Sequence, residues 1–276
     1  MQSIAHTDII KVDSGIRLAA HDILAVEEPL EIRLVYSADG KRTEKNISVT
    51  MRTPGNDAEL AAGFLYTEGI VNMPADVASF IVTKDNIVTV ELQESIAPAL
   101  NKLDRNFYTT SSCGVCGKAS IDAVKTYCDV PGDYPYDDLQ CTAELITSLP
   151  DILRTQQAVF EQTGGLHACA IFNTEGDLLL LREDVGRHNA LDKLIGASFT
   201  NRTLPLSQHI LLLSGRASFE LVQKAAMAGI KMIAAVGAPS SLAVQMAEEW
   251  NITLVGFLRG NRFNIYSGAQ RVVILQ

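Results

Sequence analysis

Several features are missing from this chain of 276 residues. No apolar run reaches the ~20 residues that a membrane-spanning helix needs. The first residues also lack the basic segment and following apolar segment of a secretory signal. Basic residues are few, with 23 Lys and Arg against 32 Asp and Glu, and the formal net charge is −9. We therefore expect a soluble cytoplasmic protein that is not a general binder of nucleic acid or membrane surfaces.

Cysteine is scarce as well. The five cysteines are an odd number and too few for a disulfide scaffold, so reduced thiols are expected. The chain has no repeat of fixed period and no low-complexity segment. Hydrophobic residues make up 47% of the sequence, which is enough for a globular protein with a proper core.

The hydrophobic pattern predicts two domains with a boundary near residue 108. Residues 1–108 are expected to form a small α+β domain, with strands at 26–36 and 47–52, a helix after 54–57, and a hairpin at 80–83 and 87–92. Residues 109–276 begin with a cysteine-bearing loop and two helical segments, at 120–127 and at 142–160, the second interrupted at Pro150. Further along the chain, helices are expected at 188–198, 218–228 and 241–249. They alternate with strands at 166–172, 178–182, 209–213, 231–236 and 252–257. This alternation predicts a layered α/β domain with a largely parallel sheet.

The sharpest local motif is Cys113-Gly-Val-Cys116-Gly, set among small and polar residues that predict an exposed loop. Its spacing suits a zinc site, a redox dithiol, or a nucleophilic thiolate with a neighbouring thiol. A closed zinc site needs four ligands, and no second Cys-x-x-Cys exists, so no structural zinc is expected. Thiol chemistry is the favoured interpretation, whereas Cys128 and Cys169 are expected to be buried core cysteines.

Small residues follow three predicted strands, in the segments 214–217, 237–241 and 256–262. Such loops lie along the carboxyl edge of a parallel sheet, where ligands bind. Arg216, Arg259 and Arg262 add planar donor groups suited to phosphate, and residues 250–276 contain three Arg and no acidic residue. The pattern favours a nucleotide-like ligand, although glycine turns and solvated arginines are common in any α/β protein.

A polar run spans residues 183–193, from a strand end into a helix. Arg187 and His188 are candidates for contacting a phosphate or carrying a proton, while Asp184 could equally cap the helix. His167 stands alone and is interpreted as a core or supporting group rather than a catalyst.

These motifs occur together in one order, at 61–69, 113–117, 167–170, 183–193, 214–218 and 254–262. In that order they resemble the FdhD family of formate dehydrogenase accessory sulfurtransferases, over most of residues 27–271. The resemblance implies a cytoplasmic homodimer. It also implies that the second domain is a three-layer αβα structure of the cytidine-deaminase-like type, without the deaminase zinc ligands.

The same resemblance implies a function. Such a protein accepts sulfane sulfur from a cysteine desulfurase and passes it to the molybdenum bis(guanine dinucleotide) cofactor of formate dehydrogenase. Cys113 matches the persulfide-bearing cysteine and Cys116 its partner thiol. The expected cofactor-binding residues, for which GDP should be a partial mimic, are Phe257, Leu258, Arg259, Gly260, Asn261, Arg262, Arg216, Arg187 and His188. A non-catalytic carrier that binds and delivers the cofactor is the alternative.

Overall fold

The computed structural model describes residues 2–98 and 139–274, apart from the side chains of 158–159. The predicted domain boundary, the predicted helix at 120–127, and Cys113, Cys116 and Cys128 lie outside the described residues.

The larger sheet has six strands in the order β13-β12-β11-β10-β8-β9. They are β8 (His167–Phe172), β9 (Leu178–Asp184), β10 (Ile210–Leu213), β11 (Met232–Ala235), β12 (Thr253–Arg259) and β13 (Arg262–Ser267). Only the β10–β11 and β11–β12 pairs are parallel, and the other three pairs are antiparallel. The prediction of a largely parallel sheet was therefore wrong. Short turns connect β8 to β9 and β12 to β13. Two strands joined by so short a connection must pair antiparallel.

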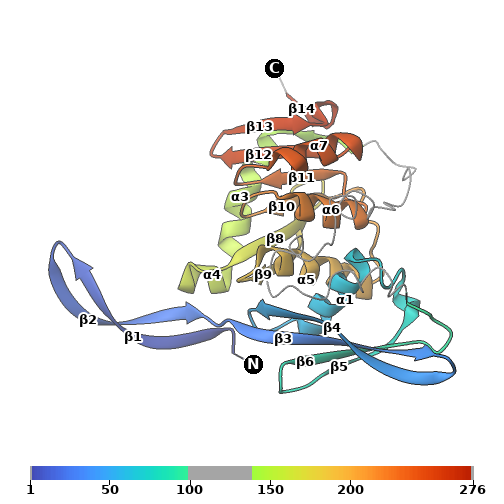
Figure 1. Cartoon of the computed structure of the whole chain (residues 1–276). Coiled ribbons are helices and arrows are strands. Elements are labelled where there is room, and N and C mark those ends of the chain that lie inside the picture. Colours follow the sequence, from blue (N-terminus) through green and yellow to red (C-terminus); the bar gives the residue numbers. More distant parts are fainter. Residues whose placement is uncertain (1, 99–138, 275–276) are drawn as a thin grey trace.

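Helices cover both faces of this sheet (Figure 1). On one face lie α5 (Arg187–Thr200), α6 (Phe219–Met227) and α7 (Ser241–Glu249), and on the other lies α3 (Ala143–Gln156). Alternate residues of β10 enter the two cores: Leu211 and Leu213 pack with the three helices, and Ile210 and Leu212 with α3. Burial on both faces explains the continuous apolar run of this strand. The predicted α/β fold and its three layers are confirmed.

The helical segment before this sheet differs from its prediction. Thr142 caps α3 by accepting a hydrogen bond from the Leu145 amide, and the helix continues through Pro150 to Gln156. The break comes at Gln157, where the short α4 (Ala158–Thr163) begins. Two short strands, β7 (Cys141–Thr142) and β14 (Val272–Val273), pair beside this region.

The smaller sheet has the order β4-β3-β6-β5. Its strands are β3 (Glu28–Ala38), β4 (Lys41–Arg52), β5 (Val77–Val82) and β6 (Ile87–Leu92), and α1 (Asp57–Thr67) covers one face. These are the strands, helix and hairpin that the sequence predicts. The described part of the chain also contains two short 3-10 helices, η1 (Pro74–Asp76) and η4 (Ala269–Arg271).

Helix α1 also packs against α5, so it lies between the smaller sheet and the larger layered unit (Figure 1). Two glycines meet at the crossing. A Cβ on Gly63 would collide with the backbone carbonyl of Asp192, and a Cβ on Gly196 with that of Glu59. The two helix backbones therefore approach more closely than any larger residue would permit.

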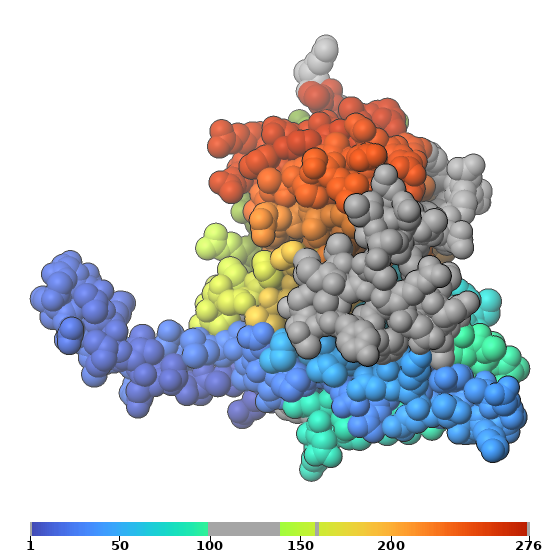
Figure 2. Space-filling model, in the orientation of Figure 1, coloured from blue at the N-terminus to red at the C-terminus, as the bar shows by residue number. Residues whose placement is uncertain are grey.

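The first two strands are not predicted from the sequence pattern. β1 (Ile4–Asp13) and β2 (Ile16–Ala25) pair only with each other and project from the body as a ribbon (Figures 1 and 2). Their alternation is weak because both faces of the ribbon are largely exposed. The available signal was the pair Ser14 and Gly15, both with positive φ, which suits a two-residue hairpin turn.

Candidate functional site

The loops after β10, β11 and within β12 lie side by side at one edge of the larger sheet. The Gly237 amide donates to the Gly215 carbonyl at 2.9 Å, and the Phe257 amide donates to the Gly237 carbonyl at 3.1 Å. The approach is close: a Cβ on Gly237 would lie 2.9 Å from the backbone nitrogen of Arg216. The predicted gathering of these segments at one edge is confirmed.

Two further residues reach this edge because β8 runs antiparallel to β10. His167 is the first residue of β8, Asp184 is the last residue of β9, and the two are paired across the strands. In the sequence His167 stands alone, which favours a core or supporting role; the direction of β8, which brings it to this edge, depends on contacts with distant segments.

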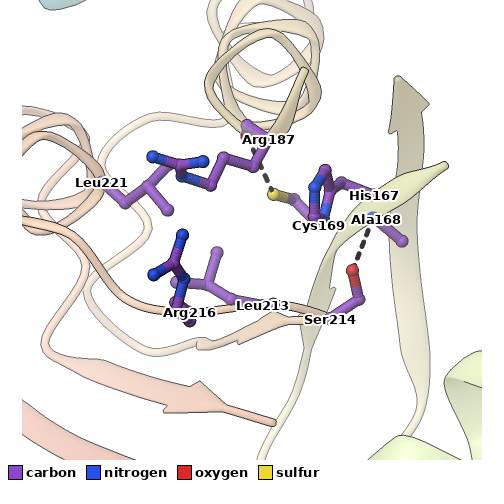
Figure 3. Close-up of a pocket in the computed structure, with 9 residues that line it drawn as sticks. His167, Ala168, Cys169, Arg187, Leu213, Ser214, Arg216 and Leu221 are labelled. Carbon is purple, nitrogen blue, oxygen red and sulfur yellow. Dashed lines mark hydrogen bonds between the residues drawn. The ribbon is translucent and has the colours of Figure 1, made fainter. Parts of the chain in front are cut away.

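A small hollow at this edge, open to solvent on one side, is lined by residues of β8, β10, the loop after β10, α5 and α6. Its lining residues are His167, Ala168, Cys169, Arg187, Leu213, Ser214, Gly215, Arg216 and Leu221. Arg187 enters from the first turn of α5 and Arg216 from the loop after β10, and both guanidinium groups point into the hollow (Figure 3). The structure thus brings together two of the predicted phosphate-binding arginines. We call this hollow the arginine pocket.

The charges of the arginine pocket are not balanced within the described part of the chain. No hydrogen bond or ion pair there joins either guanidinium to another residue, and Nε of Arg187 is buried without an acceptor. Burial, followed by the positive charge of Arg187, lowers the pKa of His167. Near pH 7 the pocket therefore presents two positive charges and a neutral imidazole.

Cys169 lies in the wall of the arginine pocket as part of the core. It is 1% exposed, and its Sγ lies 3.9 Å from the Arg187 carbonyl, to which it donates. Burial raises the pKa of this thiol well above its ordinary value. The prediction of a buried core cysteine is confirmed, and a neutral thiol of this kind is a poor nucleophile.

His188 does not line the arginine pocket, although it follows Arg187 directly. Its Nε2 lies 2.8 Å from a carboxylate oxygen of Glu220 and 3.3 Å from the hydroxyl of Ser218. The histidine therefore joins the first turns of α5 and α6. Both of these contacts use Nε2 of the ring.

Asp184 anchors the start of α5 rather than capping it, because the N-cap position belongs to Gly186. Its carboxylate accepts from the backbone amides of Thr53 and Gly186 at 3.1 and 2.8 Å, and forms an ion pair of 2.7 Å with Lys193. Asn189 adds a bond to the Met51 carbonyl at 2.7 Å. The end of β4 thereby positions the helix turn that carries Arg187.

The predicted cofactor segment is not a loop after a strand, and that part of the prediction was wrong. Phe257, Leu258 and Arg259 belong to β12, Arg262 begins β13, and Gly260 and Asn261 form the turn between them. A register shift between Gly256 and Arg259, with Phe257 at a φ of 54°, lets the strand continue past the edge. We call residues 257–262 the arginine hairpin.

The side chains of the arginine hairpin point to different surroundings. Leu258 is buried in the core that α3 covers, whereas Phe257 is 42% exposed. Arg259 and Arg262 are exposed and opposite each other in the antiparallel pair. No ion pair with an acidic residue of the described chain compensates these two charges.

Within the described residues, no group of three or more His, Cys, Asp or Glu could hold a metal ion, and no helix is both long and hydrophobic enough to span a bilayer. Because Cys113 and Cys116 lie outside that part of the chain, the expected absence of structural zinc stays a prediction.

Comparisons with known proteins agree over nearly the whole chain. The model of the FdhD/NarQ family matches residues 25–273. The Sulfur carrier protein FdhD of Streptomyces coelicolor is 50% identical over 276 residues, covering 96% of this chain and 94% of its own. The protein of the same name from Sulfolobus acidocaldarius is 43% identical, covering 98% of both chains.

A solved structure supports the fold. The crystal structure from Desulfotalea psychrophila, described as that of a formate dehydrogenase accessory protein, matches with a TM-score of 0.75. The match covers 99% of this chain and 100% of that one at 24% identity. At this identity the likeness extends to the fold alone, and it agrees with the α/β architecture described above.

Proposed function

Because this chain belongs to the FdhD/NarQ family, we propose that it is a sulfur carrier and sulfurtransferase. It takes persulfide sulfur from a cysteine desulfurase and passes it to the molybdenum bis(guanine dinucleotide) cofactor of formate dehydrogenase. The observation that carries the proposal is the near full-length identity of 43–50% to proteins named sulfur carrier protein FdhD. We further propose that it acts in the cytoplasm as a homodimer.

The sulfur-transfer half of the proposal rests on the two cysteines of the sequence motif. The Cys113 thiolate attacks the terminal sulfur of the desulfurase persulfide, the donor S–S bond breaks, and the donor cysteine leaves as a thiolate. Cys113 then carries the persulfide. Attack by Cys116 on the inner sulfur of Cys113 would release hydrosulfide to the acceptor and leave a disulfide, which a cellular dithiol must reduce.

Intact-mass spectrometry tests this half directly. After incubation with a cysteine desulfurase and cysteine, the wild-type chain is expected to gain the mass of a sulfur atom, and a reducing thiol should remove it. Cys113→Ala should gain no sulfur, because no other cysteine is expected to combine exposure with a neighbouring thiol. A sulfur gain by Cys113→Ala equal to that of wild type would contradict the assignment of Cys113.

The acceptor half rests on the cationic edge of the larger sheet. The chain carries a net charge of −9, yet no acidic residue in the described part of the chain forms an ion pair with the arginines of the arginine pocket or of the arginine hairpin. Arg259 and Arg262 lie opposite each other on the hairpin, and like charges so placed repel. An anionic ligand relieves this repulsion, and the cofactor supplies two pyrophosphates.

Calorimetry with GDP, standing for one arm of the cofactor, tests the acceptor half. Replacing Arg259 or Arg262 by Ala is expected to weaken GDP binding about tenfold to a hundredfold, because each charge-assisted bond contributes ~1.5–3 kcal/mol. Lys should rescue only in part, since it lacks the planar fork. Arg154→Ala, an exposed arginine of α3, is the control. Equal affinities in wild type and both hairpin variants would place the nucleotide elsewhere.

A further inference from the structure

The β1–β2 ribbon extends well beyond the body of the chain (Figures 1 and 2). Its two strands pair in one unbroken antiparallel register, from Ile4 with Ala25 at the base to Asp13 with Ile16 at the tip. With strands of 10 residues and a rise of ~3.3 Å per residue, the ribbon is about 33 Å long. This length exceeds the ~19 Å radius of gyration of a compact chain of this size. The ribbon can therefore reach along a second molecule.

Large apolar side chains are exposed on both faces of the ribbon. Opposite residues of an antiparallel pair share a face and successive residues alternate between faces, so Ile10 and Val12 lie on one face. Ile16 and Leu18 lie on the other face. All four side chains are more than half exposed, at 64%, 64%, 63% and 51% in chain order. A two-stranded ribbon with no further packing is only marginally stable in water, so a surface that covers these side chains would stabilise it.

The edges of the ribbon are open as well. Among the described strands, β1 and β2 pair only with each other, so each has an outer row of backbone N–H and C=O groups. Proteins commonly protect such edges with proline, a bulge or a short strand. Here the pairing has no register shift, and residues 4–25 contain no proline. Helix α4 packs against β2, which leaves the outer edge of β1 as the more accessible template for another strand.

The charges of the ribbon favour a protein surface as its partner. Nucleic acids and anionic lipids attract elements with an excess of Lys and Arg, and a lipid-bound element also has one apolar and one polar face. This ribbon is apolar on both faces, and its acidic side chains slightly outnumber its basic ones. The charged residues are Asp8, Asp13, Asp22, Lys11 and Arg17.

We propose that the ribbon is a dimerisation arm, which pairs through β1 with β1 of a second copy of this chain. Identical strands that pair antiparallel are related by a two-fold axis, so the contact closes at two copies. The two ribbons together form a four-stranded antiparallel sheet, whereas three strands already allow independent stability. Because the paired strands run in opposite directions, the tip of each arm lies beside the base of the other, where a second body can cover its apolar side chains. The arm supplies the interface of the homodimer, and to that extent the inference rests on the proposed function.

Sedimentation of the full-length chain over a range of concentrations tests the arm. Wild type is expected to sediment as a dimer. The double variant Ile10→Glu/Leu18→Glu places one charge on each face of the ribbon, at exposed positions that should not disturb the body. Its dimer dissociation constant should rise about a hundredfold or more, because the charges lose hydration in the interface. Ile81→Glu in β5, where Ile81 is 47% exposed, is the matched control and should sediment as wild type does.

Hydrogen exchange provides a second measurement, and thermal unfolding shows whether each variant is folded. Backbone amides of β1 should be protected in the wild-type dimer, and they should lose this protection on dilution and in the double variant. An unchanged dimer in the double variant would overturn the arm, while the homodimer would stand through another surface. Wild-type assemblies larger than a dimer would contradict the two-fold pairing.

The remaining outcomes separate the arm from the proposed function. A wild-type chain that sediments as a monomer would overturn the arm and the homodimer together, yet sulfur loading of Cys113 would still test the sulfurtransferase. If the β1 amides of such a monomer become protected only when a cysteine desulfurase is added, the ribbon belongs to the contact with that enzyme instead. Dissociation of Ile81→Glu as strong as that of the double variant would place the interface on the smaller sheet.

Discussion

Cys113→Ala is expected to abolish the activation of a partner formate dehydrogenase while leaving the fold intact. The sulfur atom must travel as a persulfide, and alanine has no atom that can carry it. The small residues around Cys113 predict an exposed loop, so losing this thiol should cost little packing. Formate oxidation in extracts of cells that lack their own copy, complemented with each variant, measures the effect. Cys116→Ala should impair activation less than Cys113→Ala does.

Cys141→Ala is the matched control for this experiment. Cys141 is 3% exposed in β7, and burial raises the pKa of its thiol to about 11, so it should be inert. Its variant should activate the enzyme as wild type does. If Cys113→Ala also activates fully, the sulfurtransferase proposal fails and the non-catalytic cofactor carrier is favoured.

Gly63→Ala is expected to destabilise the chain strongly, against what helix propensity alone predicts. In an isolated helix the change would stabilise by up to ~1 kcal/mol. In the folded chain, however, the new Cβ would collide with the backbone of Asp192 in α5 and lie 2.8 Å from the Gly196 nitrogen. Because backbone cannot rotate away as a side chain can, we expect a loss at or above the ~1–3 kcal/mol typical of overpacked sites. Denaturant unfolding measures it.

Gly165→Ala provides the comparison. Gly165 does not have a positive φ, and the nearest atom to its Cβ would be 3.7 Å away, an ordinary contact. Its free energy of unfolding should stay within ~0.5 kcal/mol of wild type. Equal unfolding midpoints for Gly63→Ala and wild type would show that α1 and α5 do not approach as closely as described.

Local patterns were sufficient for the fold class and for most described elements. The repeats of apolar residues that distinguish strands from helices are properties of short segments, so β3, β6, β8 and α5 were predicted close to their bounds. The arginines at strand ends and the core position of Cys169 also follow from short-range pattern. The β1–β2 ribbon was missed because strands exposed on both faces lack a clear apolar alternation.

Three-dimensional packing alone decided which side chains share a site. The antiparallel pairing of β8 with β10 brings His167 beside Arg187 and Arg216, and strand direction depends on contacts between segments far apart in the chain. The same packing places Glu220 in contact with His188, which does not line the pocket. The same packing requires glycine where α1 crosses α5, because the two helix backbones lie too close together for a Cβ. No local sequence pattern encodes the distance between two backbones.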